Sequence, residues 1–212
     1  MTTPRSIGPF GLFLAGLWGL AVCVGMGILV DYQTRPGEAA TAPHRWPEAS
    51  RIPRPSGRHQ LLVFAHPRCP CTRASIRELA LIMARCRDRL NAHVLFLLPA
   101  EFERDWAKSD LWRSAASIPG VTAQLDEGGA EARRFKAATS GHTVLYDGAG
   151  RLLFSGGITG SRGHSGDNVG RSSIVSQLND GASRSTRRSQ PDECSVYGCP
   201  LFNDDATQTV GR

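Results

Sequence analysis

An apolar strand pattern that leads directly into two cysteines and then into a helix is the feature that most constrains this chain. Residues 61–65 are all apolar, residues 69–71 read Cys-Pro-Cys, and residues 72–89 place apolar side chains at three- and four-residue steps. This pattern predicts a buried strand that delivers the cysteines to the first turn of a helix. Free N–H groups and the helix dipole at such a terminus stabilise a thiolate and make a cysteine reactive.

Three interpretations of Cys69 and Cys71 follow from these residues. The pair can carry redox chemistry, bind a metal, or serve structure alone as a bridge or as two buried thiols. A disulfide between them would close a small strained ring, which argues against a purely structural bridge. We therefore favour redox chemistry.

The second informative feature is an uncharged apolar run over residues 7–30. As a helix it would extend about 36 Å, enough to cross a hydrocarbon core of about 30 Å. A cleaved signal peptide is the alternative, but its apolar region is normally shorter and residues 30–32 do not form a small-x-small cleavage site. We expect one uncleaved transmembrane helix that contacts membrane lipid.

The orientation of that helix is only weakly encoded. Arg5 precedes the run, whereas Asp31 and Arg35 follow it, so the positive-inside signal is small. A short N-terminal tail would stay in the cytoplasm. The expected location is a bacterial inner membrane, crossed once, with the C-terminal domain in the periplasm. The use of six cysteines fits that oxidising compartment.

The rest of the chain divides by composition. Residues 1–31 form the N-terminal tail and anchor, 32–57 a Pro-rich linker, 58–181 one folded domain, and 182–212 a basic linker with a cysteine-containing tail. The net charge is +6. Because no basic stripe with interleaved aromatic residues is present, we expect attraction to anionic lipid or a solvated surface and no nucleic-acid partner.

Strand and helix patterns alternate through the folded domain. Strands are predicted over residues 61–65, 93–98, 120–126, 143–146 and 152–155, and helices over residues 72–89, 103–117, 127–138 and 171–180. The last two strands flank an Asp-Gly-Ala-Gly turn, a strong hairpin signal. Strands separated by helices predict a parallel α/β core with an antiparallel hairpin at its end.

This order resembles the thioredoxin fold, and the motifs sharpen the resemblance. The stretch from residue 121 to residue 157 is similar to the membrane-anchored thioredoxins of cytochrome maturation. The residues that carry this similarity are Asp126, Gly129, Phe135, Thr143, Asp147, Gly150 and Gly157. The His-Pro-x-Cys-Pro-Cys opening is also similar to a group of bacterial membrane proteins labelled RedB. The resemblance covers residues 61–180 and implies a thioredoxin-like α/β fold, preceded here by the transmembrane helix, and thiol–disulfide exchange.

Two departures from the thioredoxin pattern affect the expected site. Arg68 stands in line with the first cysteine of the family and Cys71 with the second, while Cys69 lies between them. Arg68 and the helix start are expected to hold the thiolate, and Pro70 to stiffen the turn.

Opposite the cysteines, where the family carries a cis-proline, this chain reads Ser140, Gly141, His142 and Thr143, and the last three are expected to face the site. Proline lacks an N–H, so its absence would change how a peptide or a metal meets the cysteines. His142 is either an imidazole base or ligand, or a loop histidine bonded to a backbone carbonyl.

Two further segments are candidates for function. Cys194 and Cys199 lie in an aromatic-apolar patch, so we expect Tyr197, Leu201 and Phe202 to pack near the cysteine turn and bring a tail thiol within exchange distance. A local tail disulfide is the alternative. The Gly-rich stretch 156–168 contains Arg, His and Asp, which could line an anion or metal pocket; the alternative is a long ordered loop.

The sequence thus predicts a membrane-anchored thiol–disulfide oxidoreductase that acts on protein thiols and disulfides through Arg68, Cys69, Pro70 and Cys71 and needs no cofactor. Cys194 and Cys199 would be auxiliary redox residues. The alternative is a copper-binding chaperone using Cys69, Cys71 and a histidine, namely His66, His142 or His164. A third hypothesis is a non-catalytic assembly factor that uses the cysteines as a clasp.

Overall fold

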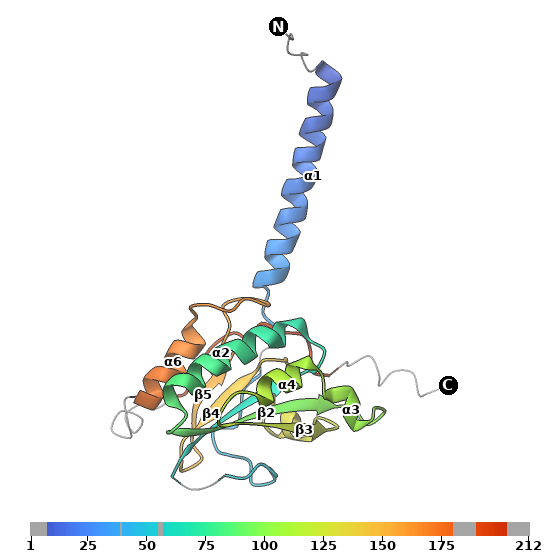
Figure 1. Ribbon diagram of the computed structural model, residues 1–212. Coiled ribbons are helices and arrows are strands. Elements are labelled where there is room, and N and C mark those ends of the chain that lie inside the picture. Colours follow the sequence, from blue (N-terminus) through green and yellow to red (C-terminus); the bar gives the residue numbers. More distant parts are fainter. Residues whose placement is uncertain (1–7, 39, 55–56, 180–189, 203–212) are drawn as a thin grey trace. The chain divides into compact units, whose positions relative to one another are not determined.

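The structure, a computed structural model, describes residues 8–38, 40–54, 57–179 and 190–202 (Figure 1). The predicted basic linker over residues 182–189 lies outside the described residues. The chain forms two compact units, one that ends at Arg35 and one that begins at Pro36.

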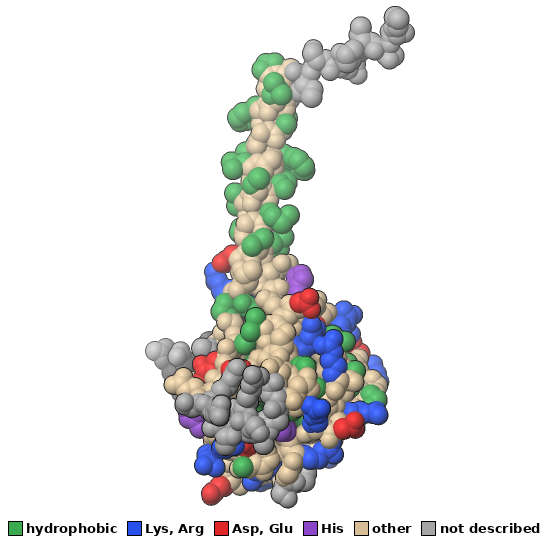
Figure 2. Space-filling model, turned by 90° about the vertical axis from the view of Figure 1, so that its left-hand side faces the viewer, with side chains coloured by type: hydrophobic (Ala, Val, Ile, Leu, Met, Phe, Trp, Pro, Cys, Tyr) green, Lys and Arg blue, Asp and Glu red, His purple; other side chains and the backbone are tan. Residues whose placement is uncertain are grey.

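The first unit contains a single long helix, α1 (Pro9–Thr34). Asp31 is its only charged residue. Its 26 residues correspond to about 39 Å at the α-helical rise, more than the roughly 30 Å of a hydrocarbon core. Apolar side chains cover the face of α1 that is in view in Figure 2. The helix is therefore long and apolar enough to cross a membrane, and it runs four residues beyond the predicted span.

The second unit is built on a six-stranded sheet in the order β3-β2-β1-β4-β5-β6. Its strands are β1 (His59–Ala65), β2 (Leu90–Leu98), β3 (Val121–Glu127), β4 (Thr143–Tyr146), β5 (Leu152–Gly156) and β6 (Asp192–Glu193). Strands β1, β2 and β3 run parallel, and β4 pairs antiparallel with both β1 and β5. The strand that leads into the cysteine turn therefore lies in the middle of the sheet.

Helices cover one face of this sheet. The helices of the unit are α2 (Pro70–Cys86), α3 (Arg104–Ala107), α4 (Asp110–Ala116), α5 (Ala130–Arg134) and α6 (Val169–Asn179). Figure 1 shows α2, α4 and α6 on the same side of the sheet. Because side chains alternate along a strand, Leu61, Val63 and Ala65 of β1 face these helices, and Leu62 and Phe64 face a second core.

The predicted thioredoxin-like α/β fold is confirmed, and two motif residues explain its local turns. Both carboxylate oxygens of Asp126 accept hydrogen bonds from the first N–H groups of α5, each at 2.8 Å. Asp147 holds the β4–β5 turn by accepting from the N–H groups of Ala149 and Arg151 at 2.9 and 2.8 Å. The two carboxylates thus give partners to backbone N–H groups that would otherwise have none, at the start of a helix and in a tight turn.

Two predicted helices differ from the structure. The helix expected over residues 103–117 is broken into α3 and α4, because the backbone of Lys108 is not helical and Ser109 caps α4 by accepting from the N–H of Trp112. The helix expected over residues 127–138 shrinks to the five residues of α5. Gly128 and Gly129 adopt positive φ angles of 61° and 68°, which delays the helix start.

The segment predicted to be a linker packs on the second face of the sheet instead. The N–H of Trp46 donates to the carbonyl of Gly150, and its ring meets Phe135 and Tyr146 edge-on at centroid distances of 5.0 and 5.3 Å. The Ser50 hydroxyl donates to Glu131 at 2.8 Å. These contacts place residues 42–52 in the second core, and the compact unit begins at residue 36.

The C-terminal segment 190–202 also belongs to the second unit. Strand β6 pairs in parallel with β5 at the edge of the sheet. Beyond it, Leu201 is buried in the second core and donates its N–H to the carbonyl of Ala138 at 2.7 Å. The expected docking of the tail on the domain is therefore observed for Leu201 and Phe202, which pack in the second core, and Tyr197 is half-buried.

The packing of the N-terminal segment predicts that Trp46→Ala lowers the free energy of unfolding by about 2 kcal/mol, through lost apolar burial and two lost aromatic contacts. Urea unfolding of the full chain in detergent, followed by circular dichroism, measures this. The matched control is Trp18→Ala in α1, which should leave the transition unchanged. Equal midpoints for wild type and Trp46→Ala would show that residues 36–54 do not stabilise the domain.

Candidate functional site

The cysteine turn forms the start of α2, as the sequence predicts. Cys69 occupies the N-cap position with extended backbone angles, and Pro70 follows at the first helical position. The N–H of Cys69 donates to the carbonyl of His66 at 3.1 Å, and the N–H of Thr72 donates to the carbonyl of Cys69 at 3.1 Å. Proline suits this position because its ring fixes a helical φ and the missing N–H would have no helical partner. The turn therefore places both thiols at the N-terminus of a 17-residue helix.

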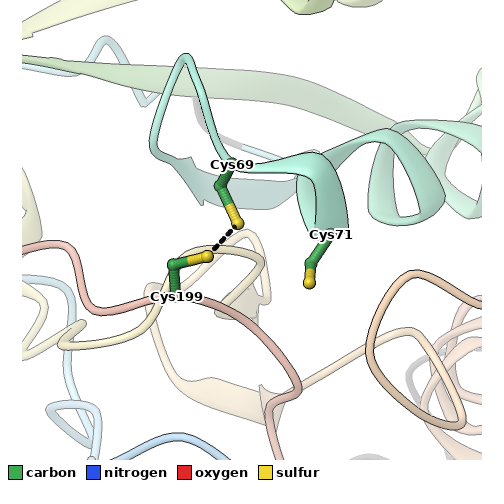
Figure 3. Close-up of side chains that lie close together, drawn as sticks. All are labelled: Cys69, Cys71 and Cys199. Carbon is green, nitrogen blue, oxygen red and sulfur yellow. Dashed lines mark hydrogen bonds between the residues drawn. The ribbon is translucent and has the colours of Figure 1, made fainter. Parts of the chain in front are cut away.

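A third thiol, from the C-terminal tail, completes the site. The sulfur of Cys199 lies 2.8 Å from that of Cys69 and points toward it, and Cys71 lies beside them on the first turn of α2 (Figure 3). All three sulfurs lie within 4.8 Å of one another. Cys194 lies elsewhere, directly after β6, where its N–H donates to the carbonyl of Ser155 in β5 at 3.1 Å. The tail thus brings Cys199 into exchange distance and not Cys194.

Backbone contacts hold the tail at this place. The N–H of Ser140 donates to the carbonyl of Cys199 at 2.8 Å, and residues 139 and 200 form an antiparallel bridge. Gly198 lies so close to the carbonyl of Ser140 that a Cβ at this position would come within 1.9 Å of its oxygen. The N–H of Gly37 donates to the carbonyl of Val196 at 2.8 Å. Cys199 is therefore positioned by main-chain pairing on both sides of it.

The surroundings of Cys69 favour its thiolate. A hydrogen bond from the Cys199 thiol, supported by the N–H groups of Cys199, Thr72 and Cys71, lowers the pKa of Cys69 to about 4 against the opposing effect of burial. The pKa of Cys199 rises in turn, first because its thiol is the partner in that hydrogen bond. Burial raises the pKa of Cys71, and the neighbouring Cys69 thiolate raises it further. One thiolate is thus flanked by two protonated thiols.

The cation beside the thiols is Arg162 rather than the predicted Arg68. The guanidinium of Arg68 lies over the ring of Trp106, 5.0 Å from its centroid, and the residue is exposed. Arg162, from the Gly-rich stretch, hydrogen-bonds to the carbonyl of Gly198 at 2.5 Å and interacts with the Cys71 sulfur, where it opposes the rise in the pKa of Cys71. The sequence offered only one signal for this residue, its place among clustered glycines.

The histidines proposed as metal ligands point to other partners. Nε2 of His142 shares a hydrogen bond with the Ser155 hydroxyl at 2.9 Å, and burial lowers the pKa of this histidine to about 4. Nδ1 of His66 accepts from the N–H of Arg68 at 3.2 Å, and Nδ1 of His164 lies 2.9 Å from the carbonyl of Arg162. Among the described residues, the group of donors close enough to share one metal ion contains the three cysteines and no histidine.

The loop opposite the cysteines supports the site through Ser140 and Gly141. The Ser140 hydroxyl accepts from the N–H of His66 at 2.8 Å and lies 2.7 Å from the hydroxyl of Thr72. Gly141 has φ +91° and donates its N–H to the carbonyl of Phe64 at 2.7 Å. Thr143 bonds back to the carbonyl of Gly141 through its hydroxyl. The sequence pointed to this loop but assigned no role to Ser140, which joins the loop to the cysteine turn.

Comparisons with known proteins bear on the fold. No protein-family model matches the sequence, and no curated protein matches it. The chain is similar to a hypothetical protein from Sinorhizobium meliloti 1021, with 18% identity over 80% of this chain and 97% of that chain and a TM-score of 0.54. It is also similar to an uncharacterized conserved protein from Geobacillus kaustophilus, with 15% identity over 81% and 94% of the two chains and a TM-score of 0.55.

A weaker likeness is to the pneumococcal exposed lipoprotein thioredoxin of Streptococcus pneumoniae strain TIGR4. It has 16% identity over 59% of this chain and 86% of that chain, with a TM-score of 0.43. The similarity to the RedB group stays a prediction.

The electrostatics of Cys69 predict that the reduced chain gains thiolate absorbance at 240 nm as the pH rises through about 4, far below the usual cysteine value of about 8.5. Cys199→Ala should move this step upward, because it removes the hydrogen bond that lowers the pKa most. Cys194→Ala, the matched tail variant, should leave it in place. A reduced chain without thiolate absorbance below pH 7 would contradict the prediction.

Proposed function

We propose that this chain is a thiol–disulfide oxidoreductase in which Cys69 is the attacking residue and Cys199 of the tail is the resolving residue. The observation that carries the proposal is the 2.8 Å separation of the two sulfurs at the start of α2. The sequence predicts that one cysteine of the Cys69 and Cys71 pair attacks and the other resolves, but Cys71 lies only two residues from Cys69 at the start of the same helix. A bridge between these two would close a strained ring, whereas Cys199 approaches from a separate segment.

The exchange proceeds in two displacement steps. The Cys69 thiolate attacks a disulfide of a partner protein, forms a mixed disulfide with one sulfur and expels the other as a thiolate. Cys199 loses its proton to solvent and attacks the Cys69 sulfur, which releases the second partner thiolate and forms the Cys69–Cys199 disulfide. Two electrons pass from this chain to the partner, and the same steps run in reverse with a partner dithiol.

Access to Cys69 requires movement of the tail. Cys69 is 2% exposed, and its sulfur lies against that of Cys199 in the tail. A disulfide of a partner protein therefore reaches Cys69 only when residues 196–202 move away from the cysteine turn. Cys199 then returns with the tail to resolve the mixed disulfide.

We further propose that α1 anchors the chain in the bacterial inner membrane and that residues 36–212 lie in the periplasm. The apolar length of α1 supports the anchor, and a compartment that permits disulfides suits the paired sulfurs. Partners would then be proteins with exposed thiols or disulfides on that side of the membrane.

The location is tested by reporter fusions at the C-terminus. A phosphatase that needs disulfides to be active should be active in cells, and a fluorescent protein that matures only in the cytoplasm should be dark. Deletion of residues 8–34 should reverse both readouts. A fluorescent full-length fusion would overturn the periplasmic placement.

The resolving role of Cys199 predicts that Cys199→Ser accumulates mixed disulfides between Cys69 and partner proteins, and lowers turnover of a disulfide peptide roughly tenfold or more. Non-reducing electrophoresis and peptide mapping measure the first effect, and a thiol-release assay the second. Cys194→Ser is the control and should accumulate none. If Cys71→Ser traps mixed disulfides and Cys199→Ser does not, the neighbouring cysteine resolves and the tail assignment is wrong.

A further inference from the structure

We propose that the fully reduced chain binds one Cu(I) ion through the sulfurs of Cys69, Cys71 and Cys199. This site differs from the sequence-based alternative, which paired two cysteines with a histidine. The carrying observation is that the three sulfurs form a compact group from two separate segments, within 4.8 Å of one another.

The spacing of the sulfurs suits a three-coordinate ion. A metal about 2.3 Å from each of three thiolates in a plane requires sulfur–sulfur separations of about 4 Å. The sulfurs of Cys69 and Cys199 lie 2.8 Å apart and must separate by about 1 Å to reach this spacing, and every pair in the group already lies within 4.8 Å. Cys69 and Cys71 are fixed on α2, so rotation of the Cys199 side chain on the tail supplies the adjustment.

The donor set selects the metal. Thiolate sulfur is a soft ligand that favours Cu(I), zinc and iron–sulfur clusters. Structural zinc takes four ligands, and no histidine or carboxylate in the described part of the chain joins the three sulfurs as a fourth. Three converging thiolates with no fourth donor match Cu(I), which accepts two or three such ligands.

The charge around the site is compatible with binding. Cu(I) with three thiolates carries a net charge of −2, and the guanidinium of Arg162 lies at the Cys71 sulfur. The N-terminus of α2 adds a positive end of a helix dipole. Each thiol that binds in place of a proton releases that proton to solvent, and copper stays in the Cu(I) state throughout.

Metal binding and disulfide formation exclude each other at this site. The Cys69–Cys199 disulfide consumes two of the three ligands and leaves Cys71 alone. Oxidation of the chain by a partner disulfide would therefore release the ion, and reduction would restore the site. The amount of bound copper would therefore depend on whether Cys69 and Cys199 are reduced or joined in a disulfide.

The test uses the full chain in detergent, reduced and kept free of oxygen, and titrated with Cu(I) from its bicinchoninate complex. We expect one Cu(I) per chain, and X-ray absorption should show three sulfur ligands at about 2.3 Å. Cys199→Ser and Cys71→Ser should each weaken binding at least roughly tenfold and leave two sulfur ligands. Cys194→Ser, the other tail cysteine, should bind as the wild type does, and the chain oxidised to the Cys69–Cys199 disulfide should bind none.

The outcomes separate this proposal from the oxidoreductase. Turnover of a disulfide peptide is measured on the metal-free chain and does not depend on copper. Binding that is as tight in Cys199→Ser as in the wild type, two sulfur ligands in the wild type, or tight Zn(II) binding in place of Cu(I) would each overturn the three-thiolate site. Circular dichroism of both variants shows whether a loss of binding comes from unfolding.

Discussion

The close approach of Gly198 to the Ser140 carbonyl is the contact on which the site depends. A side chain at residue 198 would overlap that oxygen, so only glycine lets the tail lie along residues 138–140. That alignment allows Ser140 to donate its N–H to the Cys199 carbonyl and sets the Cys199 sulfur against Cys69. The hydroxyl of the same serine holds the turn before the cysteines through the N–H of His66. Ser140 therefore fixes the position of the tail relative to the cysteine turn.

A buried ion pair holds the Gly-rich loop and α6 against helix α2. Glu78 of α2 is fully buried, and its carboxylate accepts from Arg171 of α6, from the N–H of Gly166 at 2.7 Å and from Asn168 at 3.2 Å. Loss of one partner of such a pair typically costs about 3–5 kcal/mol, because the other charge stays buried. These bonds tie the Gly-rich loop to the helix that carries Cys69 and Cys71. The loop can therefore present Arg162 to the thiols at a defined place.

The elements that the sequence predicted are those with a local pattern. The strand before the cysteines, the helix after them and the hairpin at Asp147 depend on periodicity and turn chemistry within a few residues. The packing of Trp46 on Phe135 and the pairing of Cys199 with Ser140 join segments that lie far apart in the sequence, and no local pattern in the sequence predicts such contacts. Prolines made residues 36–54 look like a linker, although an extended segment can also cover a sheet. The sequence placed Arg162 in a candidate loop but not at the thiols, because its partners Gly198 and Cys71 lie in two other segments.

The burial of Cys69 links the two chemistries proposed for the three sulfurs. A thiolate that is 2% exposed reacts with neither a protein disulfide nor a copper donor until the tail moves. The hydrogen bond that lowers the pKa of Cys69 also comes from the tail. Movement of the tail therefore exposes Cys69 and at the same time raises its pKa. With the tail in place, the Cys69 thiolate is stabilised but inaccessible. With the tail moved away, Cys69 is accessible but has lost the hydrogen bond from Cys199. Since a bound Cu(I) would occupy Cys69 and Cys199 together, a copper-loaded chain has no free attacking thiolate, and the position of the tail governs both reactions.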